Sequence, residues 1–223
     1  MVEAVREEVP QARVSRIAMP MVRAAVAPEA PRALRHRLGF APDDFVVASF
    51  GLLTREKRIE TVARAVARAA DSVPNVRLLL VGPSPDPRAL GGMLKRVGVA
   101  ARTVVAGRVA FDTLATHIEA ADLVAHLRYP TARETSAALL RVLAQGRPTV
   151  ISDLEHLADI PEDAVVRAAV DDEEGELLRA ILRLAEDSPR RVRLGERAAA
   201  FVGDAHSPDR CADGYRAAFD AAR

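Results

Sequence analysis

The chain has few of the features that would support a disulfide framework, a membrane span or a nucleic-acid partner. Its one cysteine, Cys211, excludes an internal disulfide and a cysteine-only metal site, which fits a reducing compartment. The 32 basic and 31 acidic residues give a formal net charge of +1, so no overall field attracts nucleic acid. No apolar run approaches the roughly 20 residues that span a bilayer, and the first ten residues contain no apolar signal core. We therefore expect a soluble, cytoplasmic chain without a transmembrane segment or a nucleic-acid partner.

Aromatic residues and lysines are also scarce. Aromatic side chains make up 4% of the 223 residues, whereas 49% of the residues are hydrophobic. A chain of this length and composition can bury a substantial core. Lys57 and Lys95 are the only lysines, and arginine supplies the remaining basic residues. Each lysine therefore stands out against the general usage of the chain.

The first residues do not open like a domain. Pro10 breaks a short helical pattern, and Pro20 interrupts the apolar stretch that follows. A short helix that ends at Gly39 comes after a proline-containing linker. We expect residues 1–24 to be an exit segment or linker from an absent N-terminal domain, and residues 25–223 to form one domain.

From residue 45 onward, short apolar runs alternate with helical patterns. The expected strands are 45–50, 76–81, 103–106, 123–127 and 149–152, and the helices between them are 57–71, 88–97, 111–120 and 135–145. Continuous apolar runs of this kind are typical of parallel strands buried on both faces. Consecutive helices follow over 173–185, 189–201 and 208–222. The pattern predicts an α/β fold, a doubly wound, Rossmann-like parallel sheet flanked by helices, with a C-terminal helical tail.

Such sheets bind ligands beyond the carboxyl ends of their strands. Gly51, Gly82 and Gly107 occupy equivalent turns after three strands, where a missing side chain lets a ligand approach the backbone. Each could also be an ordinary turn residue. Lys57 is expected at or near a helix start, where an ammonium group and free amides favour an anion. The alternative for Lys57 is a solvated lysine beside acidic neighbours.

A second polar connection runs from Arg128 to Ser136. Thr135 or Ser136 can cap the helix that follows, which would direct amide donors at the cleft. Arg133, Glu134 and Arg141 lie close by in the sequence. The alternative is a capped helix with charges on its surface.

Several other kinds of site find no support. The sequence contains no GxGxxG, no Walker loop, no Asp-x-Asp pair and no G-x-S-x-G motif. The five histidines lack the spacing of metal ligands, and we interpret each as a surface residue or a buried residue with satisfied hydrogen bonds. We expect no metal site.

The order of these segments is the most informative feature of the chain. A strand that ends at Gly51 and the helix opened by Lys57 are followed by the segments 78–82 (LLLVG), 105–109 (VAGRV) and 120–124 (AADLV), and then by the stretch 134–150. Together they resemble the C-terminal, donor-binding domain of group 1 glycosyltransferases, which are retaining enzymes of the GT-B fold. The resemblance covers about residues 40–222.

The resemblance implies a role for several residues. Lys57 would neutralise the diphosphate of the donor, and amides near Thr135 and Ser136 would hold the same phosphates. The backbone around Gly107 and Arg108 would meet the nucleotide base, and Gly51 would lie against the sugar-phosphate. No cofactor is implied, because the nucleoside-diphosphate sugar is the substrate. The acceptor site would belong to the missing N-terminal domain, so we expect the chain alone to be inactive or nearly so.

The chain departs from the family pattern at three positions. Leu52 replaces an arginine that commonly follows the first glycine, and Arg133 and Arg141 occupy the positions of the family's Glu-x7-Glu motif. Glu134, one place from the first of these, is the candidate catalytic residue. Two alternatives remain open: a nucleotide-sugar-binding module that has lost catalysis, and half of a GT-B sugar-nucleotide epimerase.

Overall fold

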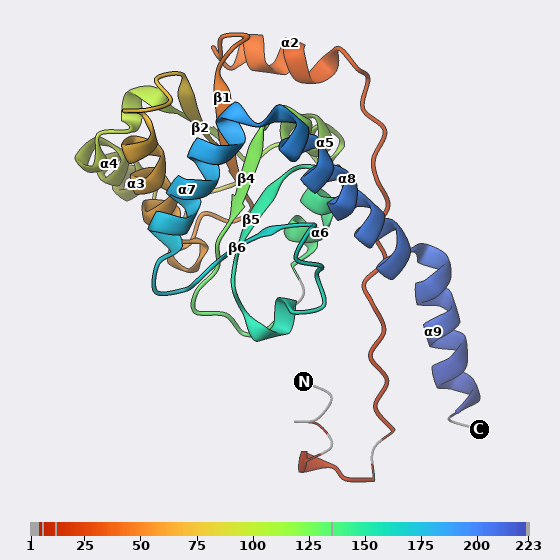
Figure 1. Ribbon diagram of the computed structural model, residues 1–223. Helices are drawn as coiled ribbons and strands as arrows, with labels where there is room; N and C mark the ends of the chain where they lie inside the picture. Colours follow the sequence, from red (N-terminus) through yellow and green to blue (C-terminus); the bar gives the residue numbers. More distant parts are fainter. Residues whose placement is uncertain (1–4, 6, 12, 135, 222–223) are drawn as a thin grey trace.

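The computed structural model describes residues 5, 7–11, 13–134 and 136–221 and places one six-stranded sheet at its centre (Figure 1). All the strand pairings are parallel, and the order of the strands is β3-β2-β1-β4-β5-β6. The strands are β1 (Phe45–Phe50), β2 (Val76–Val81), β3 (Thr103–Gly107), β4 (Leu123–His126), β5 (Thr149–Ser152) and β6 (Val166–Ala168). The strand order reverses between β1 and β4, which is where doubly wound sheets bind ligands.

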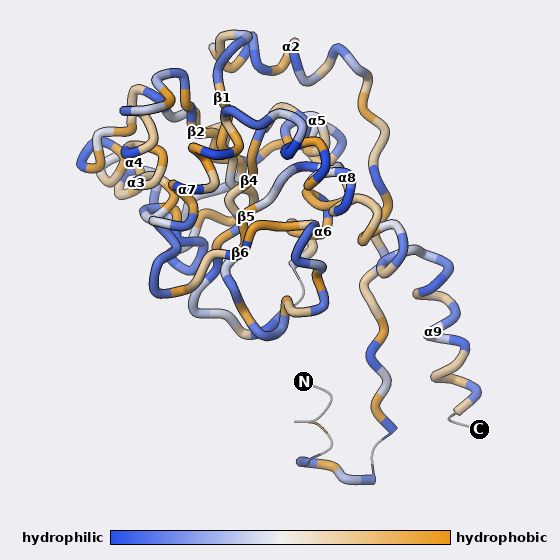
Figure 2. The backbone as a smooth tube through the Cα atoms, viewed as in Figure 1, coloured by the Kyte–Doolittle hydropathy of each residue, from blue (hydrophilic) through white to orange (hydrophobic). Residues whose placement is uncertain are grey.

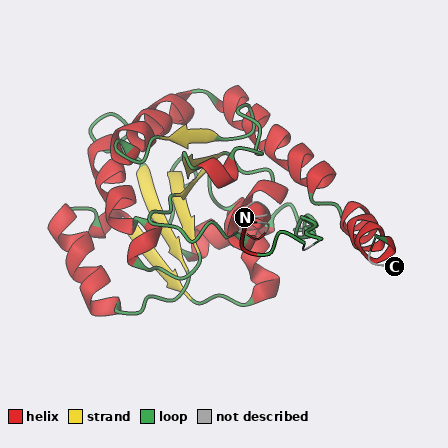
Figure 3. Ribbon diagram, turned by 90° about the horizontal axis from the view of Figure 1, so that it is seen from below, coloured by secondary structure: helices red, strands yellow, loops and turns green. Residues whose placement is uncertain are grey.

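Helices cover both faces of the sheet. The helices are α2 (Ala30–Arg37), α3 (Ile59–Ala69), α4 (Pro87–Val97), α5 (Phe111–Glu119), α6 (Ala137–Ala144), α7 (Glu173–Glu186), α8 (Ser188–Ala205) and α9 (Pro208–Asp220). α3, α4 and α7 pack on one face, and α2, α5 and α6 cover the other. Figure 3 shows the strands enclosed by helices while α9 projects from the domain. The predicted doubly wound α/β fold with a helical tail is confirmed.

The central strand β1 is largely apolar because both of its faces are buried. All six residues of β1 are buried, and their side chains point alternately to the two faces. Phe45 and Val47 join the core cluster under α3 and α7, whereas Val46 and Ala48 join the cluster under α5 and α6. Figure 2 shows the same distribution, with hydrophobic residues concentrated on the strands and hydrophilic ones on the periphery. Nowhere in the described part is a helix both long and apolar enough to cross a membrane.

Most of the expected boundaries agree with the structure, but the helix expected from Lys57 begins later. Arg55–Lys57 form a 3₁₀ turn, η1, and α3 begins at Ile59. Arg58 lies between them with a φ of 55°, a left-handed conformation that interrupts the helix. The expected helix start at Lys57 is therefore wrong by two residues. The helix predicted over 189–201 also continues to Ala205.

Residues 13–27 run in an extended conformation beside α8 and α9 (Figure 1). The Met21 amide donates to the carbonyl of His206 at 2.8 Å. Gln145, buried after α6, exchanges two hydrogen bonds with the backbone of Ala24, at 2.9 and 3.2 Å. Residues 13–27 are therefore held against the domain by backbone pairing as well as by side chains. The helical pattern expected over residues 2–9 lies partly outside the described residues.

The helical tail approaches the sheet domain closely at a pair of glycines. Gly195 lies in α8, and a Cβ atom added to it would come within 2.0 Å of the carbonyl oxygen of Gly146, which follows α6. Gly203, two turns further along α8, has nothing within 4 Å of the same position. A side chain at Gly195 would therefore force the two elements apart.

We expect Gly195→Ala to lower the free energy of unfolding by about 1–3 kcal/mol through overpacking. Gly203→Ala is the matched control in the same helix, and we expect it to be neutral or to stabilise by up to about 1 kcal/mol. Urea denaturation of both variants measures the difference. Equal effects of the two substitutions would contradict the close packing of α8 on the end of α6.

Candidate functional site

The structure brings the three glycine turns side by side at the carboxyl ends of β1, β2 and β3. The Gly51 amide donates to the Val81 carbonyl at 2.9 Å, and the Gly82 amide donates to the Gly107 carbonyl at 2.7 Å. All three glycines have positive φ angles, and a Cβ on Gly82 would lie 1.9 Å from the Gly51 oxygen. Glycine at residue 82 is therefore required by this close approach.

A pocket of about 380 Å³ opens beside these glycines. Its lining includes Gly51, Gly82 and Arg108, together with apolar side chains from the strand ends and from α5. The guanidinium group of Arg141 also lines the pocket and lies 4.9 Å from the centre of the Phe111 ring, a cation–π contact. The pocket thus combines apolar walls, exposed glycine backbone and two arginines.

Lys57 is buried beside this pocket. The residue is only 7% exposed, and a Cβ on Gly51 would lie 3.8 Å from its Nζ atom. The ammonium group therefore lies against the backbone of Gly51. The alternative of a solvated lysine is wrong, because the 3₁₀ turn directs the side chain inward.

Burial and positive neighbours lower the pKa values of two basic groups here. Burial, followed by the nearby Arg128, lowers the pKa of Lys57 to about 8, while Glu134 opposes the shift. Burial also lowers the pKa of His126 well below its usual value, and Lys57 and Arg128 add to this. Lys57 is consequently charged but poorly solvated at neutral pH, and His126 is neutral.

His126 was not predicted as a site residue. It ends β4, is 3% exposed, and its Nδ1 atom has no hydrogen-bond partner among the described residues. The expectation that a buried histidine is satisfied is therefore wrong for His126. Its position at the end of a strand beside the switch point was the signal available in the sequence.

The loop between β4 and α6 brings a second set of charges to the site. The Arg128 amide donates to the Ser152 hydroxyl at 2.8 Å, and the Tyr129 amide donates to the Glu56 carbonyl at 2.9 Å. The Arg128 guanidinium pairs with Glu134, although its buried Nε has no partner in the described chain. A hydrogen bond from its own backbone amide, and then Arg128, lower the pKa of Glu134. Glu134 is thus an ionised carboxylate paired with a cation.

The remaining predicted residues fall in different places. Ser136 caps α6, and its hydroxyl accepts from the Leu139 amide at 3.3 Å. Thr135 lies outside the described residues. Arg133 has a φ of 61° and pairs at 3.2 Å with the exposed Glu155, so its side chain is turned toward the turn after β5. The structure therefore brings Lys57 and Glu134 together around Arg128 but directs Arg133 elsewhere.

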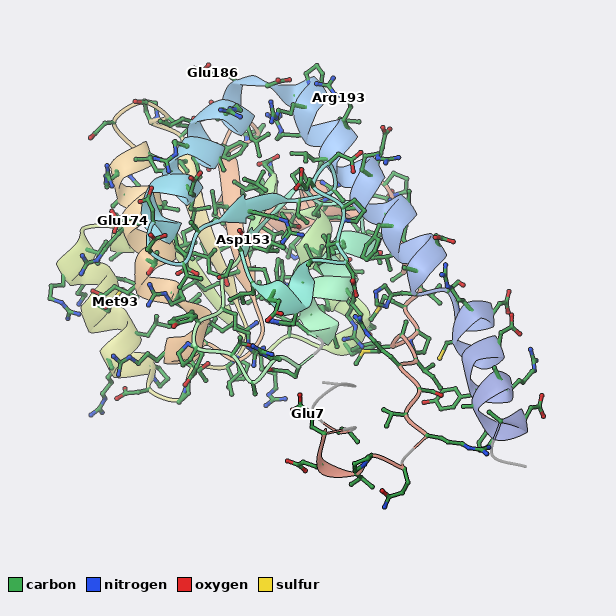
Figure 4. All side chains as sticks on the ribbon, turned by 60° about the horizontal axis from the view of Figure 1, so that its bottom comes forward. Glu7, Met93, Asp153, Glu174, Glu186 and Arg193 are labelled. Carbon is green, nitrogen blue, oxygen red and sulfur yellow. The ribbon has the colours of Figure 1, made fainter. Side chains whose placement is uncertain are left out.

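A larger hollow, of about 640 Å³, lies between the β6 edge of the sheet and α8. Its lining carries charges of both signs, and Arg197 pairs there with Asp163 at 2.7 Å. Arg193, labelled on α8 in Figure 4, belongs to the same lining. The glycine turns and the strand ends of β1 to β4 take no part in it, so we place the candidate site in the smaller pocket.

The family of the chain follows from comparison with known proteins. The family model for group 1 glycosyl transferases matches residues 44–187, well over half of the chain. The chain belongs to this family. The matched residues contain the three glycine turns, Lys57 and the β4–α6 loop.

A similar curated protein is the D-inositol 3-phosphate glycosyltransferase of Segniliparus rotundus. It is 31% identical over 196 residues, which cover 85% of this chain and 43% of that protein. The chain therefore spans less than half the length of this relative.

Two solved structures have the same fold as this chain. Anabaena HepE in complex with UDP superposes with a TM-score of 0.78 at 21% identity over 88% of this chain and 54% of that one. The C-terminal domain of the group 1 family protein LpcC from Francisella tularensis superposes with a TM-score of 0.66 at 12% identity, over 84% of this chain and 96% of that one. This member of the group 1 family has the Rossmann-like α/β fold of these structures, one of which is a C-terminal domain.

We expect Lys57 to make the free energy of unfolding rise with pH between about 8 and 10.5, its folded and ordinary pKa values. In this range the unfolded chain holds the proton more tightly than the folded one, so deprotonation favours folding, by at most about 3 kcal/mol. Lys57→Met should be more stable than the wild type near neutral pH and should lose this rise.

Urea denaturation at about pH 7 and about pH 9.5 measures the effect. Lys95→Met, which removes the other, exposed lysine, is the matched control and should keep the rise. A Lys57→Met variant with the same pH dependence as the wild type would show that the ammonium group is solvated.

Proposed function

We propose that this chain is the donor-binding half of a glycosyltransferase, which transfers a sugar from a nucleoside-diphosphate sugar to an acceptor. The observation that carries the proposal is the ammonium group of Lys57, buried against the backbone of Gly51 next to an open pocket. A buried cation with little solvation is costly unless an anion neutralises it. A diphosphate group is the anion that group 1 family membership favours.

The donor would lie across the glycine turns. Its diphosphate would contact Lys57, Gly51 and the amides at the start of α6 near Ser136, where the helix dipole favours an anion. Its base would enter the pocket near Gly107 and Arg108. UDP, present in the Anabaena HepE complex, is the first nucleotide to test.

In the proposed reaction the bond between the anomeric carbon and the diphosphate breaks while the acceptor hydroxyl bonds to the same carbon. The leaving phosphate takes the hydroxyl proton on the same face, so the anomeric configuration is retained. Lys57 would stabilise the negative charge that develops on the leaving group. Glu134 is the candidate catalytic carboxylate. The acceptor would be supplied by a domain outside this chain, so we expect weak donor binding and little turnover by the chain alone.

A binding module without catalysis is the second candidate. Arg133 and Arg141 replace the two glutamates of the family pattern, and Glu134 is paired with Arg128 instead of being free to act. A two-domain form that binds donor but neither transfers nor hydrolyses it would establish this candidate. Epimerised donor formed without any acceptor would identify an epimerase instead.

We expect isothermal titration to show saturable binding of one of UDP, GDP and ADP to the chain. Lys57→Met should weaken this binding roughly ten- to a hundredfold, because a charged hydrogen bond to phosphate is lost. Affinity for the same nucleotide should also fall as the pH rises past about 8, where Lys57 loses its proton.

Lys95→Met is again the control and should bind like the wild type, since Lys95 is exposed on α4. Equal heats with all three nucleotides, unchanged in Lys57→Met, would mean general attraction to arginines and would refute the proposed site.

We expect Phe111→Ala to separate base recognition from phosphate recognition. Phe111 lines the pocket and holds Arg141 there, so its removal should weaken nucleoside-diphosphate binding several-fold through lost stacking and apolar contact. Inorganic diphosphate has no base, and its affinity should not change. Titration of both ligands tests this, and a parallel loss for both would place the base elsewhere.

A further inference from the structure

Glu173 is a buried carboxylate that is not part of the described pocket lining. It opens α7, and its side chain is only 1% exposed. One oxygen accepts a hydrogen bond from Arg58 Nε at 2.7 Å, and the other accepts from the Ser152 hydroxyl. The residue lies 115 positions from Arg58 in the sequence, so this is a tertiary contact.

Each of the two hydrogen bonds to Glu173 connects it to a different loop of the candidate site. Arg58 directly follows Lys57 and adopts the left-handed conformation that ends the 3₁₀ turn. Ser152 donates its hydroxyl proton to Glu173 and accepts the Arg128 amide at 2.8 Å with the same oxygen. A single carboxylate therefore ties the Lys57 turn and the Arg128 loop to the start of α7.

The neighbouring glutamate shows that a salt bridge at the start of α7 does not require burial. The side chain of Glu174 is partly exposed and pairs with Arg68 of α3 at 2.9 Å. Figure 4 labels Glu174 beside α3 and α7. A buried charge is a poor source of stability, because the lost hydration offsets most of the attraction. What the burial of Glu173 provides is a fixed geometry for the two groups bonded to it.

We infer that Glu173 is a positioning residue, which holds the Lys57 turn and the Arg128 loop at the spacing that a diphosphate requires. The inference rests on the proposed function for its ligand. Among the described residues Glu173 is not part of the pocket lining, and its hydrogen bonds lead to Arg58 and Ser152, so it acts through them. The bond from the Tyr129 amide to Glu56 also joins the two loops, so loss of Glu173 loosens the site without detaching them.

The test is a double-mutant cycle measured by titration with UDP and with inorganic diphosphate. Glu173→Gln keeps the size of the side chain but removes its charge, and we expect it to weaken binding roughly five- to tenfold. In a Lys57→Met background the same change should have a smaller effect, because one of the two groups that Glu173 positions is gone. Glu174→Gln is the matched control and should leave binding unchanged. Losses of equal size in both backgrounds, or with both glutamates, would overturn the inference.

Amide hydrogen exchange gives a second measurement that needs no ligand. The Arg128 amide should exchange faster in Glu173→Gln than in the wild type, whereas Glu174→Gln should not change it. Ser152→Ala removes the acceptor of the Arg128 amide itself and sets the exchange rate of a released loop. Glu173→Asp keeps the charge but shortens the side chain; it should also speed the exchange, and it covers the case of a Glu173→Gln variant that does not fold. A wild type that binds neither ligand refutes the proposed function, whereas unchanged exchange at Arg128 refutes the role of Glu173.

Discussion

The buried ammonium group of Lys57 against Gly51 is the contact on which the rest of the candidate site depends. Removing an ammonium from water costs several kcal/mol unless opposite charge surrounds it. Here Arg128 is a second cation nearby, and Glu134 is the anion that offsets both. The turn and the loop that carry these charges are held by Glu173, so a tertiary network maintains a site that is electrostatically strained. Such a site gains most from a ligand that carries two negative charges.

The architecture could be predicted because parallel sheets impose a strong pattern. Strands such as β1 are buried on both faces, so runs of apolar residues identified them without knowledge of their partners. The glycine turns could also be predicted from the positions of the strands, because the ends of neighbouring strands bring their backbones close together. Ser136 was one of two candidate caps, and a hydroxyl before an apolar helix is a local signal.

The parts that could not be predicted depend on contacts between distant residues. Arginine has no intrinsic preference for the left-handed conformation that Arg58 adopts. In this conformation Arg58 pairs with Glu173, which lies in α7, far away in the sequence. The burial of Lys57 follows from the same turn. His126 and Ser152 are single residues at strand ends, and nothing in their immediate sequence distinguishes them from ordinary core positions. Local patterns identify elements, whereas the charges of this site are arranged by packing.

The placement of the arginines around the site determines which of them could contact a phosphate. Arg141 contacts Phe111 in the pocket wall, and Arg133 pairs with Glu155, so neither lies beside Lys57. Arg128 is the cation beside Lys57, and its side chain is already paired with Glu134. A diphosphate bound at Lys57 would compete with Glu134 for this guanidinium, because both offer oxygens to the same donors. Under the proposed function, displacement of Glu134 from Arg128 would release an ionised carboxylate into the site. In that arrangement donor binding itself would free the candidate catalytic group.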